Sequence, residues 1–171
     1  PFFLKKTLLN QKFNKENHEY TLTMIGKFQK RKNHKFLIDL VKVLNKEIKV
    51  KAIIIGSRPP QKEEDNLESI REYIKKLKIN NIFIQNAIDN IKVNEILKVS
   101  HFFILPSIDE PAAFSPYEAL SNGNILFINK ENIMNHNLKR FNCIEEINID
   151  STKDTAQKII KIIKHKDLES E

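Results

Sequence analysis

The stretch HFFILPSIDEPAAFSPYEALSNGNILFI, residues 101–128, contains the pattern that decides the fold. Two short apolar runs, FFIL at 102–105 and ILFI at 125–128, enclose a loop and a helical segment that begins near Ser115. Apolar runs of this length, bounded by turn residues, are typical of strands that are buried on both faces. A strand, a helix and a second strand in this order predict a βαβ unit with two parallel strands.

The same alternation extends over most of the chain. Further strands are expected at Tyr20–Ile25, 51–55 and 82–84, and further helices at 36–44, 67–77 and 93–97. A last helix is expected from the capping-box sequence STKD at 151–154 onward, and its apolar face consists of Ala156, Ile159, Ile160 and Ile163. Parallel strands need crossover helices that cover the sheet. The sequence therefore predicts an α/β fold: a Rossmann-like, doubly wound parallel sheet of about six strands with helices on both faces.

Length and composition favour one globular domain. The chain has 171 residues, of which 40% are apolar and 30% charged, enough for one core and too few for two ordinary domains. No apolar run reaches the roughly 18 residues of a membrane span. Residues 20–166 are predicted to form the domain, with 1–19 as a linker from a preceding N-terminal domain and 167–171 as a polar tail. We therefore expect the chain to be part of a longer protein.

The net charge of +7 raises the question of a nucleic-acid partner. Only four of the 29 basic residues are arginine, and the lysines are spread evenly without an aromatic-interleaved basic stripe. We therefore expect no nucleic-acid function, although a non-catalytic basic binding module stays an alternative. The single cysteine, Cys143, excludes an internal disulfide and fits a reducing cytoplasm.

Ligands of doubly wound sheets bind outside the carboxyl ends of the strands. The segments in that position are Gly26-Lys27, Gly56-Ser57-Arg58, 85–87 and 107–115. Ala112, Ala113 and Ser115 are small and lead into a helix whose first N–H groups lack intrahelical partners and attract anions. Lys27 and Lys32 lie in the loop after the first strand. Together these groups predict a diphosphate site, and the alternative is that both lysines are ordinary solvated side chains.

Two glutamates bracket this turn. A carboxylate can accept two hydrogen bonds from a vicinal diol. Glu118, one turn into the helix, is therefore a candidate ligand of a ribose. Glu110, before the turn, is a candidate for sugar hydroxyls or for stabilising positive charge that develops on a sugar ring. The alternative is a helix acid that balances the dipole and a solvated loop acid.

From about Tyr20 to Ile128, and onward to Ile163, the chain resembles the C-terminal, donor-binding domain of GT-B glycosyltransferases of the family 4 type, also called group 1. The specific part is the stretch 101–128, which has Pro-Ser followed by Glu-x7-Glu. The second glutamate of this motif is followed directly by alanine and, shortly afterwards, by a glycine. The segments IGKFQKRKN, AIIIG and NNIFIQNAI resemble the family's first loop, its second strand and its third strand with the following loop.

This resemblance implies a role for each candidate residue. It places Glu110 at the donor sugar as the catalytic carboxylate and Glu118 at the ribose. The diphosphate would be bound by Lys27, Lys32 and the backbone of Ala113, Phe114 and Ser115. The base would lie against Asn86, Ala87 and Ile88, and the rest of the pocket would be lined by Gly26, Gly56 and Ser57. The chain departs from the family where Lys27 replaces arginine and where Ala113 and Asn86 replace glycines. Because no Asp-x-Asp occurs, we expect neither a metal nor another cofactor.

The resemblance implies the donor-binding domain of a hexosyl-type, retaining glycosyltransferase that builds surface polysaccharides, lipopolysaccharides or glycoconjugates. Its partners would be a UDP- or GDP-sugar and a sugar or lipid-linked acceptor bound through the N-terminal domain, so the isolated chain is expected to be inactive. The expected location is the cytoplasm, with the inner face of the membrane as the alternative. The competing enzyme interpretation is half of a GT-B-fold sugar-nucleotide epimerase or phosphorylase.

Overall fold

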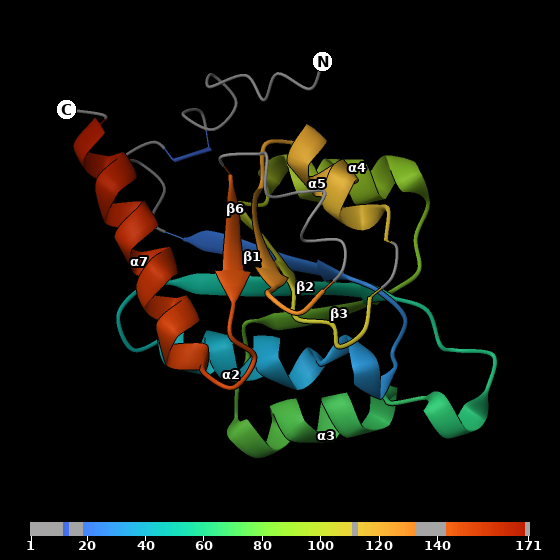
Figure 1. Ribbon diagram of the computed structural model, residues 1–171. Helices are drawn as coiled ribbons and strands as arrows, with labels where there is room; N and C mark the ends of the chain where they lie inside the picture. The colour runs from blue at the N-terminus through green and yellow to red at the C-terminus, as the bar shows by residue number, and fades with distance from the viewer. Residues whose placement is uncertain (1–11, 14–18, 111–112, 133–142, 170–171) are drawn as a thin grey trace.

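Six parallel strands form one sheet in the order β3-β2-β1-β4-β5-β6 (Figure 1). The computed structural model describes residues 12–13, 19–110, 113–132 and 143–169. The strands are β1 (Tyr20–Ile25), β2 (Val50–Gly56), β3 (Ile82–Asn86), β4 (Phe102–Leu105), β5 (Ile125–Asn129) and β6 (Ile144–Ile147). The helices are α2 (His34–Leu44), α3 (Leu67–Leu77), α4 (Asn90–Val99), α5 (Ser115–Ser121) and α7 (Thr152–Glu169), with short 3₁₀ helices η1 (Lys30–Lys32) and η2 (Lys62–Glu64).

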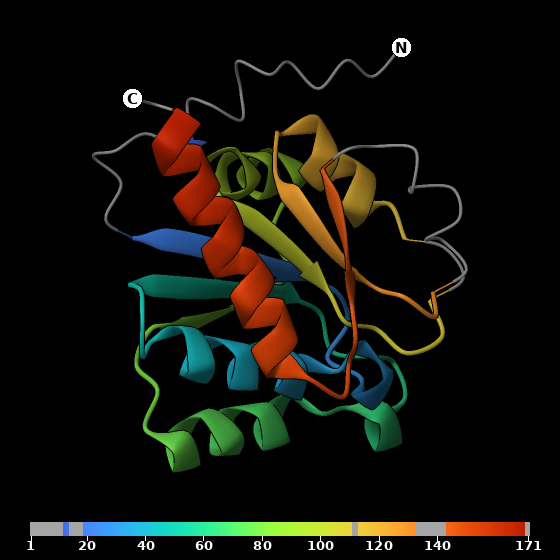
Figure 2. The same ribbon diagram turned by 60° about the vertical axis from the view of Figure 1, so that its left-hand side comes forward.

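Helices cover both faces of this sheet. Figures 1 and 2 show α2, α3 and α7 on one face and α4 and α5 on the other. Strand β4 illustrates why: Phe102 and Ile104 belong to the core under α2, α3 and α7, whereas Phe103 and Leu105 belong to the core under α4 and α5. Successive side chains of a strand point to opposite faces, so an uninterrupted apolar run supplies two cores.

The predicted fold class is confirmed, and five of the six strands match the predicted ranges closely. The sixth, β6, was counted among about six strands but not located. Its sequence is IEEI, and Glu145 and Glu146 interrupt the apolar run that identified the others. It pairs with β5 alone at the edge of the sheet, where half-exposed polar side chains are tolerated.

The last helix begins where the capping sequence predicts. The Ser151 hydroxyl oxygen accepts a hydrogen bond from the Asp154 N–H at 3.3 Å, which is the contact of an N-cap residue. Helix α7 continues to Glu169 and so includes 167–169, which the sequence had assigned to a polar tail.

Two residues of the predicted linker pack against the edge of the sheet where β4 begins. Phe13 is 3% exposed, and its ring lies edge-on to His101 with centroids 5.2 Å apart. The Lys12 ammonium group donates hydrogen bonds to the carbonyl oxygens of Leu97 at 2.9 Å and Ser100 at 2.7 Å. Both residues thus contact the core of the domain. The division into linker, domain and tail stays a prediction.

Candidate functional site

The loops after β1, β2 and β3 meet at the carboxyl edge of the sheet. The N–H of Phe28 donates to the carbonyl oxygen of Ser57 at 2.9 Å, and Asn86 pairs in register with Gly56. A Cβ atom on Gly56 would lie 2.2 Å from the carbonyl oxygen of Gly26. Glycine at this position therefore allows the first two loops to approach each other more closely than any other residue would.

The loop after β1 is also joined to the loop after β4. The Ile108 N–H donates to the Arg31 carbonyl oxygen at 2.7 Å, and the Asn33 side chain donates to the Pro106 carbonyl oxygen at 3.5 Å. Asn33 and Asp109 have positive φ values of 55° and 54°. Asparagine and aspartate adopt this left-handed conformation more readily than most residues, so both turns are consistent with their sequence.

A buried ion pair lies at the junction of these two loops. The Lys32 ammonium group contacts the Glu110 carboxylate directly, and the two residues are 7% and 3% exposed. A second cation, the Arg31 guanidinium group, lies 3.8 Å from the same carboxylate oxygen. The sequence assigned Lys32 to a phosphate and Glu110 to a sugar. The structure brings these two side chains into contact, so the charge of each strongly affects the electrostatic energy of the other.

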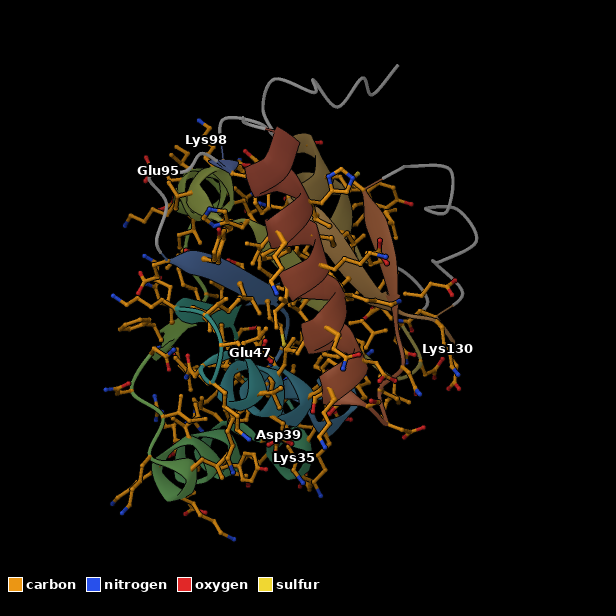
Figure 3. All side chains as sticks on the ribbon, turned by 90° about the vertical axis from the view of Figure 1, so that its left-hand side faces the viewer. Lys35, Asp39, Glu47, Glu95, Lys98 and Lys130 are labelled. Atoms are coloured by element: carbon orange, nitrogen blue, oxygen red, sulfur yellow. The ribbon has the colours of Figure 1, made fainter. Side chains whose placement is uncertain are left out.

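The backbone of Glu110 is held from another direction. Its N–H donates to the side-chain oxygen of Asn132 at 2.9 Å. The Asn129 side chain, at the end of β5, donates to the Ser107 carbonyl oxygen at 3.0 Å. Figure 3 labels Lys130, which follows β5 at this edge, and Lys98, near the opposite edge where β4 begins. The strand β5 therefore also contributes to the site.

The predicted phosphate turn leads into α5 as expected, because α5 begins at Ser115. Pro116 occupies the first turn, where the absence of its N–H costs little. Ala113 and Ser115 are partly buried, whereas the Phe114 side chain is 86% exposed. Glu118 lies in the first turn of this helix and is partly buried.

The other predicted residues differ in exposure. Lys27 is exposed, so of the two predicted phosphate ligands it is the one that faces solvent. Asn86 and Ala87 are exposed at the end of β3, and Ile88 packs partly against the core under α4 and α5. These three residues follow the strand next to β2, at the same edge as Gly56.

Histidine 34, the first residue of α2, was not predicted as a site residue. It is 1% exposed, and within the part of the chain that the structure describes neither ring nitrogen has a hydrogen-bond partner. Its ring lies 5.7 Å from that of Phe28. Burial disfavours the imidazolium form and the charge of Lys32 opposes it further, which lowers the pKa of His34 to about 4. The ring is therefore neutral near pH 7.

Sequence reasoning also missed Arg31, Asn129 and Asn132. Arg31 adjoins the predicted Lys32, but its approach to Glu110 depends on a contact between distant loops. Asn129 is the last residue of β5, and Asn132 lies in the loop that follows it. Their signal was a position at or shortly after the carboxyl end of a predicted parallel strand, where ligands of such sheets bind.

Within the part of the chain that the structure describes, His, Cys, Asp and Glu side chains form no group of three that could hold a metal ion. None of the helices described there has the length and hydropathy of a membrane span.

The chain matches the protein family described as glycosyl transferases group 1 over residues 5–171. No curated protein is similar enough in sequence to match. Solved structures with the same fold include the C-terminal domain of the glycosyl transferase group 1 family protein LpcC from Francisella tularensis. It shares 17% identity over 91% of this chain and 82% of its own, with a TM-score of 0.70.

Two longer proteins also match. WaaG, a glycosyltransferase involved in lipopolysaccharide biosynthesis, shares 16% identity over 93% of this chain, with a TM-score of 0.68. The pneumococcal O-GlcNAc transferase GtfA, solved in complex with UDP and GlcNAc, shares 16% identity over 84%, with a TM-score of 0.61. This chain spans 42% of WaaG and 28% of GtfA. The fold, the Glu-x7-Glu stretch and the match over residues 5–171 together establish that the chain belongs to the glycosyl transferases group 1 family.

Proposed function

We propose that this domain binds the nucleotide-sugar donor of a hexosyl-type glycosyltransferase. The observation that carries the proposal is the buried contact between Lys32 and Glu110 at the carboxyl edge of the sheet. It places a candidate phosphate ligand and a candidate sugar ligand in one cluster. Family membership and the UDP complex of GtfA support a sugar nucleotide as the ligand.

The proposed donor lies along this edge with its diphosphate near the loop after β1. Lys27 and Lys32 supply positive charge, and the N–H groups ahead of α5, from Ala113 to Ser115, supply hydrogen-bond donors. Glu118 accepts from the ribose hydroxyls. The base packs against the loop formed by Asn86, Ala87 and Ile88, and Gly26, Gly56 and Ser57 line the space between these groups.

In the proposed reaction the bond between the anomeric carbon and the diphosphate breaks, the acceptor oxygen bonds to that carbon, and the proton of the acceptor hydroxyl passes to the leaving diphosphate. The leaving nucleoside diphosphate carries the negative charge that Lys27 and Lys32 stabilise, which is electrostatic catalysis by groups already in place. Glu110 faces the positive charge that develops on the sugar ring. Retention of the anomeric configuration and catalysis without a metal are parts of this proposal.

The activity of the whole protein is proposed on the same grounds. Because WaaG and GtfA are much longer than this chain, we place the acceptor site outside residues 20–166. The acceptor is a sugar or a lipid-linked sugar, and the product a surface polysaccharide, lipopolysaccharide or glycoconjugate. We place the enzyme in the cytoplasm, at the inner face of the membrane when its acceptor is lipid-linked.

Calorimetric titration of the chain with UDP, GDP, ADP, CMP and their sugars tests the proposal. We expect one nucleoside diphosphate series to bind in the presence of EDTA, and its affinity to fall as salt rises because the diphosphate contacts are ionic. Lys27→Ala should weaken binding, whereas Lys98→Ala, a change on α4 near the opposite edge of the sheet, should not. Absence of binding to every ligand in this series would overturn the proposal.

A further inference from the structure

Two buried asparagines, one at the end of β5 and one in the loop that follows, hold the loop that carries Glu110. Asn129 and Asn132 are 1% and 2% exposed. The Asn132 N–H donates to the Asn129 carbonyl oxygen at 3.0 Å, so the two residues form one turn. The Asn129 side chain binds the backbone at Ser107, and the Asn132 side chain binds the backbone N–H of Glu110. The loop is thereby fixed at Ser107 and again at Glu110.

We infer that Asn132 is a positioning residue for the Glu110 carboxylate, an inference that rests on the function proposed above. Glu110 is held by two kinds of contact. Lys32 and Arg31 hold its carboxylate from the loop after β1, and Asn132 holds its backbone from the other side. A bound diphosphate competes with the carboxylate for Lys32. The bond from Asn132 does not involve these charges, so it keeps Glu110 in place when the ligand binds.

The orientation of the Asn132 amide follows from its partner. The Glu110 N–H is a donor, so the atom that faces it must be the amide oxygen. The amide nitrogen then lies buried, with no hydrogen-bond partner among the described residues. Replacing Asn132 by alanine removes this unpaired group together with the useful acceptor. The variant should therefore release Glu110 from its position while changing the free energy of unfolding comparatively little.

Asn124 provides a matched control at the other end of β5. It is 0% exposed, and its amide nitrogen donates to the carbonyl oxygens of Leu97 and Ser100. Its amide oxygen is buried and has no partner among the residues that the structure describes. Asn124→Ala thus removes an equally buried amide with one unpaired atom. It does so at the edge of the sheet opposite to Glu110.

The test uses the affinity ratio between a nucleotide sugar and its free nucleotide. Because Glu110 is proposed to act on the sugar, this ratio reports its position, and a uniform loss of stability does not change it. Calorimetry compares UDP-glucose with UDP and GDP-mannose with GDP. We expect Asn132→Ala to lower the ratio by roughly threefold to tenfold, the size of one hydrogen bond, and Asn124→Ala to leave it unchanged.

A double-mutant cycle shows whether Asn132 acts through Glu110. In a Glu110→Gln background, where the carboxylate is absent, Asn132→Ala should lower the ratio no further. An unchanged ratio in Asn132→Ala alone, an equal loss in Asn124→Ala, or a full additional loss in the Glu110→Gln background would each overturn the inference.

Amide hydrogen exchange at Glu110 gives a second measurement, which needs no ligand. Exchange should be faster in Asn132→Ala, unchanged in Asn124→Ala and still slow in Asn132→Asp, which keeps an acceptor oxygen. Unchanged exchange in Asn132→Ala would overturn the inference but leave nucleotide binding, and hence the proposed function, intact. A wild-type chain that bound none of UDP, GDP, ADP, CMP and their sugars would overturn the proposed function and this inference with it.

Discussion

Lys32 and Glu110, 78 positions apart in the sequence, form an ion pair that is buried between the loops after β1 and β4. Charges that leave water lose their hydration, so each depends on the other for compensation. The pair therefore joins the two loops. It also brings together the two charged groups that are proposed to contact the donor.

Lys32→Met should lower the free energy of unfolding by about 3 kcal/mol, because it takes from the buried Glu110 its closest cation and leaves the more distant Arg31. Urea denaturation followed by circular dichroism measures this loss. Lys30→Met, on the exposed face of η1, should change stability by less than about 0.5 kcal/mol. The double variant Lys32→Met/Glu110→Gln should recover part of the loss. No recovery would show that the charge of Glu110 is not the cause.

Glu110→Gln should strengthen binding of the free nucleoside diphosphate. The ligand-free variant leaves the Lys32 charge without its closest partner, and a bound diphosphate supplies one. Calorimetry should show a several-fold gain in affinity. Asp109→Asn is the control, because it removes the same charge from an exposed neighbour whose positive φ of 54° asparagine tolerates. An equal gain in both variants would indicate a general effect of charge.

Glu118→Gln should weaken binding of ribonucleotides more than that of 2′-deoxynucleotides. A carboxylate that accepts from the ribose hydroxyls loses strength when it becomes a neutral amide. Titration of the variant with UDP and 2′-deoxy-UDP, or with the corresponding guanine nucleotides, tests this difference. Glu95→Gln, the same change on the exposed surface of α4, should leave both affinities unchanged. Equal losses for both nucleotides in Glu118→Gln would argue against a contact with the ribose.

Stability should fall as the pH is lowered from about 6.5 to about 4. Burial lowers the pKa of His34 and of His101 to about 4 from the ordinary value of 6.5. Between these values the unfolded chain binds more protons than the folded one, so protonation favours unfolding, by up to about 3 kcal/mol for each histidine.

Urea denaturation at several pH values checks this dependence. His34→Leu should reduce this dependence, because it removes one of the two titrating groups. Neither ring nitrogen of His34 is bonded to a described residue, so the variant loses no such hydrogen bond. A change at the exposed His165 should leave the dependence as it is in the wild type. A His34→Leu variant with the full wild-type slope would show that His34 does not contribute.

Gly56→Ala should disrupt the site, whereas Gly26→Ala should be tolerated. A Cβ atom at position 56 would lie 2.2 Å from a backbone oxygen, so the loops would have to separate. The nearest atoms to a Cβ atom at position 26 would be those of the Lys32 side chain at 3.4 Å, an ordinary van der Waals contact. Thermal denaturation and nucleotide titration of the two variants compare them directly. Similar behaviour of both would contradict the close approach.

The sequence was sufficient to predict the parallel sheet because most strands are apolar on both faces. Strand β4 has four consecutive apolar residues and was located correctly, whereas β6, with two glutamates in its centre, was not. An edge strand needs fewer apolar residues than a central one, so periodicity identifies it less well.

The candidate site was predicted as a location more reliably than as a set of contacts. Post-strand loops converge in any sheet of this class, so Lys32 and Glu110 could be expected at the same edge. Their direct pairing depends on how two distant loops pack, which local sequence does not encode. Local sequence likewise does not encode the hydrogen bond between Asn132 and Glu110 or the burial of His34 beside Phe28.

Lys12 and Phe13 bear on where the domain can be shortened. A version that began at Tyr20 would lose the aromatic ring that packs on His101 and would leave two carbonyl oxygens at the end of α4 without their ammonium donor. Water would then enter the space that the Phe13 ring occupies and reach the start of β4. Expression boundaries for crystallisation or binding studies should therefore lie upstream of Lys12.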